Sequence, residues 1–133
     1  MKISTKGRYA LKIMTELALN YERDEYISAA TLATRLGISI KYLEIIIALL
    51  NKAGYLRVLR GSQGGYQLKK SPKEYIIGDI LNKTEGELSP TYCLTDEGSC
   101  QQKTSCETYL FWKGLDDTIN EYIYSKTLQD LIH

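Results

Sequence analysis

Apolar residues recur along residues 4–22 at the three- and four-residue spacing of a helix with one buried face. The positions on this face are Ala10, Ile13, Met14, Leu17, Ala18 and Tyr21. The polar run "ERDE" then interrupts the pattern. The sequence therefore predicts an N-terminal amphipathic helix over residues 4–22.

Two further apolar segments follow, each with its own boundary residues. Ser28 precedes "AATLATRL", which ends at Gly37, and Ser39 precedes "IKYLEIIIALLNKA", which ends at Gly54. Serine is a good N-cap and glycine favours helix C-termini. The pattern therefore predicts a short helix, a tight turn and a longer helix, which is the helix-turn-helix arrangement.

The stretch "YLRVLRGSQGGYQLKK" comes directly after the second of these helices. Its two short runs of Tyr, Leu and Val flank a glycine-rich centre, which is typical of a β-hairpin. A helix-turn-helix followed by a basic hairpin indicates a winged helix.

The remaining chain predicts mainly helix. "YIIGDILNKTEG" favours a helix that ends at Gly86, and "TYLFWKGLDDTINEYIYS" favours a strongly amphipathic one. Thr127 is a suitable cap for the closing "TLQDLI". The expected fold class is thus mostly α: a winged helix-turn-helix DNA-binding domain over residues 1–86, a cysteine loop over 87–106, and a dimerisation helix with a C-terminal segment over 107–133.

Charge divides the chain into two unlike parts. Residues 1–73 carry thirteen Lys/Arg and five Asp/Glu, a net +8, and residues 74–133 carry four and eleven, a net −7, which together give the overall +1. A basic patch on a helix-turn-helix protein points to a nucleic-acid partner. We therefore expect double-stranded DNA to bind the first part.

The start of the second helix of a helix-turn-helix lies against base edges in the major groove. Here those residues are Ser39, Lys41, Tyr42 and Glu44. Lys41 suits a phosphate or a guanine edge, and Glu44 suits a cytosine amino group. An ordinary solvated helix face is the alternative interpretation of the same residues.

The other candidate DNA contacts lie at the hairpin tip and at two helix starts. Arg60, beside Gly61, Ser62 and Gln63, is placed to enter the minor groove. Phosphate contacts are expected from Lys2, Lys6, Arg8, Tyr9 and Thr31.

The apolar face of the last helix has two possible uses. Phe111, Trp112, Leu115, Ile119, Tyr122 and Ile123 share it. They either pack on their own domain or form a homodimer interface. We prefer the dimer, because winged-helix proteins commonly bind two half-sites as two-fold dimers.

All three cysteines lie in "CLTDEGSCQQKTSC", as Cys93, Cys100 and Cys106. The N-terminus lacks the apolar run of a signal peptide, and no stretch is long enough for a membrane span, so we expect a cytoplasmic protein. Thiols there stay reduced, which favours metal binding or redox sensing over disulfides.

The segments "STKGRYA", "KYLE" and "RGSQGGY" resemble the bacterial winged-helix regulators of the IscR, NsrR and CymR type (Rrf-type), and the similarity covers nearly the whole chain. The resemblance implies a homodimer held by the C-terminal helix, base reading by Ser39, Tyr42 and Glu44, and insertion of the wing through Arg60. It also implies control of iron–sulfur assembly, nitrosative stress, iron or sulfur metabolism.

Cluster-bearing members of that family hold iron–sulfur through three cysteines in the loop before the dimer helix. The spacing C-x6-C-x5-C of Cys93, Cys100 and Cys106 is close to theirs, so the resemblance implies a cluster here, 2Fe–2S or 4Fe–4S. Thiolates are the usual ligands and four per cluster are usual, so one position is left for another group. The sequence departs from the family at that group.

Some members supply a histidine three residues after the last cysteine, where Tyr109 stands, or an acid from the partner's first helix, where Arg8 stands. The only histidine is His133. Asp96, Glu97 and Glu107 are local candidates, with no ground to choose among them.

Three other functions are alternatives to a cluster-sensing regulator. The same DNA-binding protein could use a cluster-free thiol switch, pairing Cys93 with Cys106 or Cys100, or hold adventitious zinc. The basic helix-turn-helix half argues against a small electron carrier. An enzyme with a small-molecule substrate is not expected, because there is no internal histidine, phosphate-binding Gly-Lys-Ser/Thr loop or nucleophile elbow.

Overall fold

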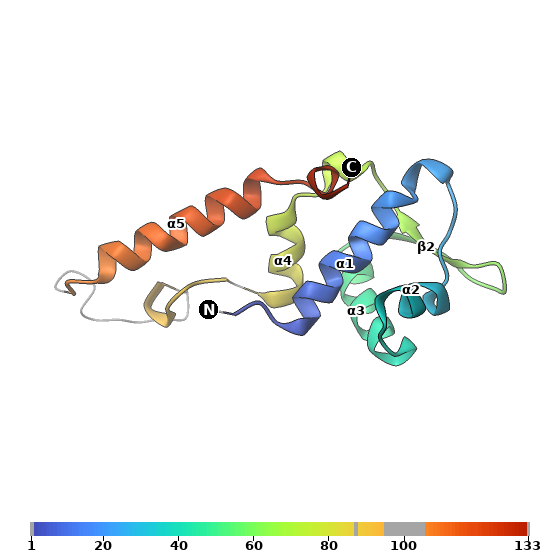
Figure 1. The fold of residues 1–133 in the computed structure, drawn as a ribbon, viewed down its shortest axis with the longest axis horizontal. Coiled ribbons are helices and arrows are strands. Elements are labelled where there is room, and N and C mark those ends of the chain that lie inside the picture. The colour runs from blue at the N-terminus through green and yellow to red at the C-terminus, as the bar shows by residue number, and fades with distance from the viewer. Residues whose placement is uncertain (1, 87, 95–105, 133) are drawn as a thin grey trace.

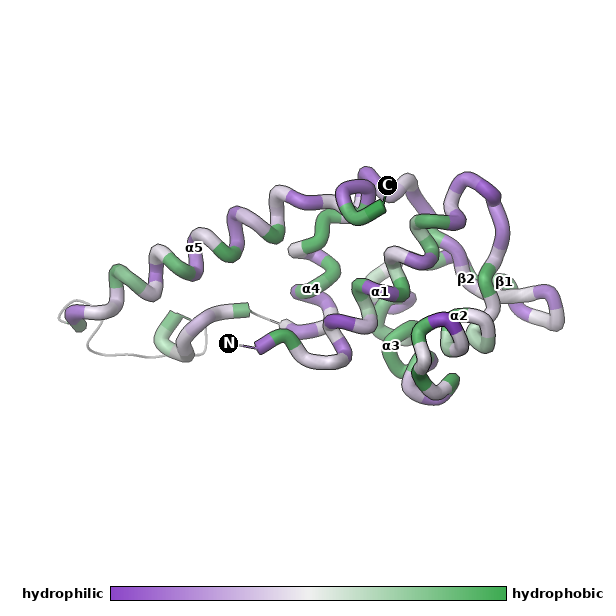
Figure 2. The backbone as a smooth tube through the Cα atoms, viewed as in Figure 1, coloured by the Kyte–Doolittle hydropathy of each residue, from purple (hydrophilic) through white to green (hydrophobic). Residues whose placement is uncertain are grey.

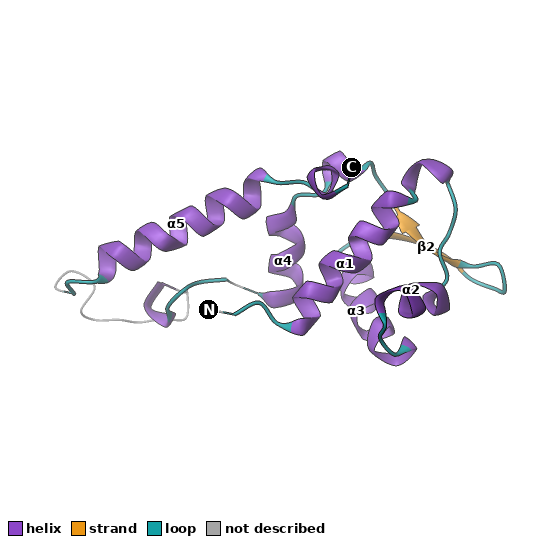
Figure 3. Ribbon diagram, viewed as in Figure 1, coloured by secondary structure: helices purple, strands orange, loops and turns teal. Residues whose placement is uncertain are grey.

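The computed structural model describes residues 2–86, 88–94 and 106–132. Figures 1 and 3 show a helical body with a small hairpin on one side and one long helix extending from the other. The main elements are α1 (Thr5–Leu19), α2 (Ala29–Leu36), α3 (Ile40–Lys52), β1 (Leu56–Leu59), β2 (Gly65–Leu68), α4 (Ile77–Glu85) and α5 (Tyr109–Ser125). Short 3-10 turns lie between them: η1 (Tyr21–Arg23), η2 (Pro72–Glu74), η3 (Tyr92–Leu94) and η4 (Leu128–Leu131).

Helix α1 runs through the middle of the body and contacts α2, α3, α4, β2 and η4. Its core face is the one predicted from the sequence, since Ala10, Ile13 and Met14 are completely buried. The helix ends at Leu19 rather than at residue 22. The side-chain amide of Asn20 donates a hydrogen bond to the Glu16 carbonyl, and the chain then turns into η1. Tyr21 is consequently only half-buried.

The helix-turn-helix forms as the sequence predicts. The side chain of Ser28 accepts a hydrogen bond from the Thr31 amide and caps α2, and Ser39 does the same for α3 through the Tyr42 amide. Gly37 ends α2 with φ +68°, in the left-handed region that glycine enters without strain.

The wing is an antiparallel hairpin in which Leu56 pairs with Leu68 and Leu59 with Gly65. Ile27, just before α2, joins the hairpin through two backbone hydrogen bonds with Tyr66, of 2.9 and 2.8 Å. This bridge ties the wing to the start of the helix-turn-helix. The winged-helix fold predicted from the sequence is therefore confirmed.

Tyr75 joins the end of the wing to the start of α4. Its buried hydroxyl donates to the Tyr55 carbonyl at 2.8 Å and accepts from the amides of Lys69 and Lys70, each at 3.1 Å. Burial raises the pKa of Tyr75. The phenol therefore stays protonated and keeps all three hydrogen bonds.

The C-terminal segment returns to the body beside Tyr75. The Leu128 amide donates to the Tyr75 carbonyl and the Ile77 amide donates to the Lys126 carbonyl, both at 2.9 Å. Thr127 caps η4 as predicted, and Leu128 is completely buried in the common core. Both ends of the segment that contains α5 are thus fixed to the winged helix.

Helix α5 itself projects from the body (Figure 1), and Figure 2 shows hydrophobic and hydrophilic residues alternating along it. Its predicted apolar face is divided in the monomer: Trp112, Ile119 and Ile123 are half-buried, whereas Phe111 and Tyr122 are 67% and 64% exposed. No helix in the described part of the chain, α5 included, is long and apolar enough to cross a membrane.

Gly78 allows α5 to dock on α4. A Cβ at this buried position would lie 2.6 Å from Cδ1 of Tyr124. We expect Gly78→Ala to lower the free energy of unfolding by about 1–3 kcal/mol, because overpacking outweighs the helix propensity gained from alanine. Urea denaturation at fixed protein concentration measures this change in the free energy of unfolding.

Gly114→Ala is the matched control, because a Cβ there meets no atom within 4 Å and the residue is exposed in the helix α5. This variant should keep or gain stability. The penalty at Gly78 should shrink in a Tyr124→Ala background, and an equal penalty with and without the Tyr124 ring would contradict the packing explanation.

Candidate functional site

The N-terminal end of α3 presents polar side chains to solvent. Ser39, Lys41 and Glu44 are exposed. The opposite face of the same helix is buried, with Leu43 and Ile46 completely inaccessible. Of the four predicted base-reading residues, Lys41 and Glu44 therefore lie on the side that a groove-bound ligand could meet, and Ser39 is exposed as the N-cap of the helix.

Tyr42, the fourth, is half-buried and packs against Tyr9 of α1. The two rings meet edge to face, with 6.1 Å between centroids and 86° between planes. The ammonium group of Lys12 lies 5.1 Å from the centre of the Tyr9 ring. The sequence analysis assigned Tyr9 to a phosphate and Tyr42 to a base, and the structure brings the two together as one aromatic pair.

Lys6 and Arg8 lie on the first turn of α1 and are exposed. Basic side chains at a helix N-terminus face the positive end of the helix dipole, which disfavours them unless an anion is near. One carboxylate is supplied from the body: Glu85, at the end of α4, accepts from the backbone amides of Ser4 and Gly7 at 2.9 and 3.1 Å.

A polar pocket of about 330 Å³ joins the wing to α2. Its lining includes three predicted DNA contacts, Thr31 together with Ser62 and Gln63. Arg60 and Gly61 are exposed at the same hairpin tip. The fold therefore gathers residues that lie about thirty positions apart in the sequence.

Two arginines outside the predicted set of DNA contacts also line this pocket, Arg23 and Arg35. Arg35 forms an ion pair with Glu16 at 3.3 Å and remains 46% exposed. Their basic charge was visible in the sequence. The position of Arg35 one turn after Thr31 on α2 was also visible, whereas the approach of Arg23 to this pocket depends on tertiary packing and was not.

Two apolar side chains of α3 were also missed. Ile40 and Ile45 are 47% and 51% exposed, on the side of the helix away from the core. The sequence signal was present, because the run "EIIIALL" contains more apolar residues than one buried face of a helix accommodates. Exposed aliphatic groups beside Glu44 suit contact with thymine methyl groups.

Of the three cysteines, two belong to the described residues. Cys93 lies in η3, half-buried, with its sulfur 3.1 Å from the Thr91 hydroxyl, and η3 contacts α5. Cys106 is exposed three residues before α5. Cys100 falls outside the described residues, as do Asp96 and Glu97.

The surroundings of Cys106 lower the pKa of its thiol below the ordinary value of a cysteine. The Thr108 hydroxyl, 3.4 Å from the sulfur, lowers the pKa of Cys106, and the backbone amides of Thr108 and Tyr109 act in the same direction. The neighbouring Glu107 carboxylate opposes them. Within residues 2–86, 88–94 and 106–132, no three His, Cys, Asp or Glu side chains are grouped so that they could hold a metal ion.

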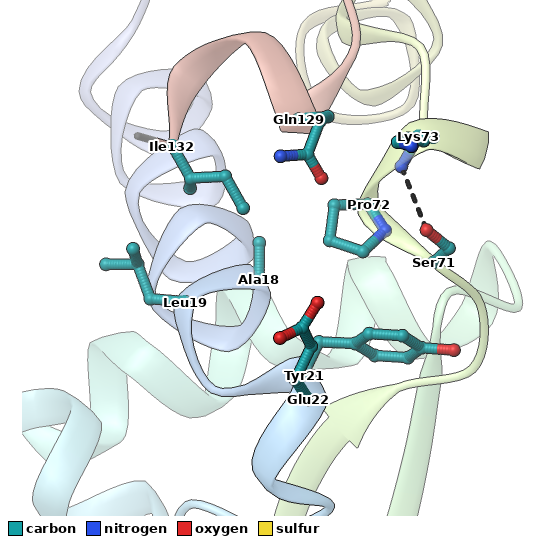
Figure 4. Close-up of a pocket in the computed structure, with 9 residues that line it drawn as sticks. All are labelled: Ala18, Leu19, Tyr21, Glu22, Ser71, Pro72, Lys73, Gln129 and Ile132. Carbon is teal, nitrogen blue, oxygen red and sulfur yellow. Dashed lines mark hydrogen bonds between the residues drawn. The ribbon is translucent and has the colours of Figure 1, made fainter.

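A separate pocket of about 340 Å³ lies between α1, η2 and η4 (Figure 4). Leu19, Tyr21 and Ile132 line it together with polar groups of η2, where the Lys73 amide donates to the Ser71 hydroxyl. None of the predicted DNA or cysteine residues belongs to this lining. It therefore adds nothing to the surface formed by α1, α2, α3 and the wing.

Comparison with known proteins supports a regulatory function. The Rrf2 family model, described as iron-dependent transcriptional regulator, matches residues 3–133. The HTH-type transcriptional regulator IscR of Pectobacterium carotovorum is 34% identical over the whole chain, which spans 80% of that protein. The corresponding IscR of Escherichia coli is 32% identical, with 81% of it covered.

Solved structures of related regulators support the same family. CymR, the global cysteine regulator of Bacillus subtilis, superposes with a TM-score of 0.81 and 37% identity, over 98% of this chain and 95% of CymR. IscR of T. potens gives a TM-score of 0.78 and 34% identity, over 99% and 86%. These relatives are transcriptional regulators and not enzymes. The chain belongs to the Rrf2 family of transcriptional regulators.

Proposed function

We propose that the protein is a homodimeric, cytoplasmic DNA-binding regulator that senses iron–sulfur status through a labile cluster on its three cysteines. The observation that carries the DNA-binding part is the exposure of polar side chains at the start of α3 and at the wing tip, together with the polar pocket between the wing and α2. A groove-reading helix flanked by a wing and by basic side chains is the arrangement expected for duplex DNA.

The division of roles follows from the surroundings of each side chain. Ser39, Lys41 and Glu44 meet base edges, and Tyr42 is held in place by Tyr9. The wing inserts Arg60, with Gly61, Ser62 and Gln63, into the minor groove. Lys6, Arg8 and Thr31 bind phosphates, which fixes the orientation of α3.

The exposed apolar side chains of α5 support the homodimer. Leu110 is 79% exposed and Phe111 67%, beside a Trp112 ring that Phe111 meets at a centroid distance of 5.0 Å. A helix that leaves the body with large apolar groups in solvent is typical of an interaction face. A second copy of the same helix covers it by two-fold symmetry and doubles the DNA-reading surface.

The donor chemistry of the cysteines fits iron–sulfur. Cys93, Cys100 and Cys106 would hold the cluster, since soft thiolates are its usual ligands. Cys93 lies beside α5 through η3, and Cys106 lies just before α5. A bound cluster supplies redox- and iron-sensitive chemistry at this end of the dimer helix.

A cluster-free thiol switch is the second candidate, and the lowered pKa of Cys106 favours it. CymR of Staphylococcus aureus, which shares 34% identity and a TM-score of 0.76 with this chain, has been solved in an oxidized form. That relative is compatible with redox chemistry in this family. The two candidates share the DNA-binding surface and differ only at the cysteines.

The wing assignment predicts a loss on truncation of one side chain. Arg60→Ala should weaken specific operator binding about tenfold, because an arginine in the minor groove contributes about 1–3 kcal/mol. Fluorescence anisotropy of labelled operator DNA at a fixed salt concentration measures this loss of affinity. Arg57→Ala, an exposed strand arginine with the same charge change, is the control, and equal losses in the two variants would contradict a wing-specific contact.

The cluster assignment predicts colour. Anaerobically purified or reconstituted protein should show visible charge-transfer absorption with equal iron and acid-labile sulfide, and Cys106→Ser should abolish both while the dimer remains. A colourless, iron-free protein after reconstitution would contradict the cluster and leave the thiol switch.

The thiol switch makes a separate prediction for cluster-free protein. The alkylation rate of Cys106 should follow thiolate formation and rise at lower pH than for an ordinary cysteine. Thr108→Val removes the largest cause of the lowered pKa, so the midpoint of the rate profile should move to higher pH and alkylation at neutral pH should slow.

The backbone amides remain in that variant, so the midpoint should not return fully to the ordinary value. Thr118→Val, whose hydroxyl instead bonds the Gly114 carbonyl, is the control and should leave the profile unchanged. Peptide mass spectrometry follows the alkylation of Cys106 in both variants. A profile that Thr108→Val does not move would remove the support for this second candidate.

A further inference from the structure

Helix α1 lacks the acidic residue that normally completes its N-terminal cap. Ser4 is the N-cap, and its side chain accepts from the Gly7 amide at 3.3 Å. In a capping box the third helical residue is Glu or Gln, whose side chain reaches back to the N-cap amide. That position is Gly7, and the first turn contains no acidic residue.

Glu85 supplies the missing carboxylate from another helix. Its Oε1 accepts from the amide and the hydroxyl of Ser4, and from the amide of Gly7 at 3.1 Å. The N-cap amide and the third helical amide have no backbone acceptor within the helix, and one carboxylate oxygen accepts from both, in addition to the Ser4 hydroxyl that accepts from Gly7. The capping box is therefore completed by the last residue of α4.

Gly7 is required for this arrangement. A Cβ at residue 7 would lie 2.0 Å from Glu85 Oε1, and the next nearest atoms also belong to the Glu85 side chain. Gly7 is buried, so the space that it leaves is filled by the carboxylate. The glycine of "STKGRYA" thus has a steric explanation that local sequence does not provide.

The cap lies beneath two predicted phosphate contacts. Lys6 and Arg8 flank Gly7 on the same turn and are exposed. The positive end of the helix dipole disfavours two cations nearby, and a carboxylate at the same helix end offsets that repulsion. Without the carboxylate, the N-terminus of α1 loses three hydrogen bonds at a place where the charged side chains of the first turn are all basic.

We propose that Glu85 is a positioning residue for DNA binding: it caps α1 from α4 and holds the first turn so that Lys6 and Arg8 reach phosphates. This inference rests on the proposed function of these two residues. Glu85 does not touch DNA itself, because a carboxylate facing phosphate would weaken binding. It acts through the backbone amides that it holds.

The sign of the effect separates this role from ordinary electrostatics. Removing an acid makes the protein more basic, and that alone would strengthen binding to DNA. We expect Glu85→Ala to do the opposite and weaken operator binding about tenfold. We also expect a less steep salt dependence, by about 0.9 in the logarithmic slope for each phosphate that is no longer neutralised.

Asp79→Ala is the matched control for charge, because Asp79 is an exposed acid on the same helix. It should leave affinity unchanged or slightly higher. Glu74→Ala controls for capping, since Glu74 completes the box of η2 by accepting from the Ser71 amide. It should alter the unfolding midpoint but not the salt slope. Glu85→Ala binding as tightly as Asp79→Ala with an unchanged slope would overturn the inference.

Relocating the acid provides a rescue. Gly7→Glu in the Glu85→Ala background places a carboxylate at the standard capping-box position, in the space that Glu85 vacates. Affinity and salt slope should return toward wild type in this double variant. Failure of the double variant to recover, while remaining a folded dimer, would overturn the inference.

Two measurements distinguish this inference from the proposed function. Hydrogen exchange at the Ser4 and Gly7 amides reports the cap without DNA and should accelerate at least tenfold in Glu85→Ala; unchanged exchange would overturn the inference. The double variant Lys6→Ala and Arg8→Ala tests the phosphate contacts directly. If it binds the operator like wild type, the proposed contacts fail; if it weakens binding and Glu85→Ala does not, only the positioning role fails.

Discussion

Burial of one face of α1 is the constraint on which the rest of the fold depends. This helix contacts α2, α3, α4, β2 and η4, so most of the winged helix is placed against it. Its core positions Ala10, Ile13 and Met14 have no accessible surface. Apolar burial of this kind is the main source of stability in a domain of this size. The exposed side of the same helix is then free to contribute Lys6 and Arg8 to the surface beside α3.

Local signals in the sequence predicted most of this fold. Ser28, Gly37 and Ser39 mark helix boundaries because each makes a backbone interaction within a few residues of itself, and such interactions are readable from sequence alone. The three- and four-residue spacing of apolar residues likewise predicted the core face of α1, and two short apolar runs around a glycine-rich centre predicted the hairpin. The family resemblance predicted a winged-helix regulator, and the comparisons confirm that family.

Interactions between distant residues could not be predicted in this way. Gly7 and Glu85 are 78 positions apart, and Arg23 lines the same pocket as Ser62 and Gln63 although about forty positions separate them. Tyr9 and Tyr42 were each identified as functional, but their pairing depends on the crossing of α1 and α3. The individual DNA contacts and the metal-binding role of the cysteines remain predictions, since they concern partners outside the chain.

The return of the chain at Thr127 has a consequence for how such regulators diversify. The segment between Gly86 and Lys126 starts and finishes on the same body, since α4 precedes it and the Lys126 carbonyl bonds the first residue of α4. It is topologically a long insertion between two fixed points. Its length and cysteine content can therefore change by mutation without altering the register of the helices that read DNA. One DNA-binding body can in this way acquire different sensors over evolutionary time.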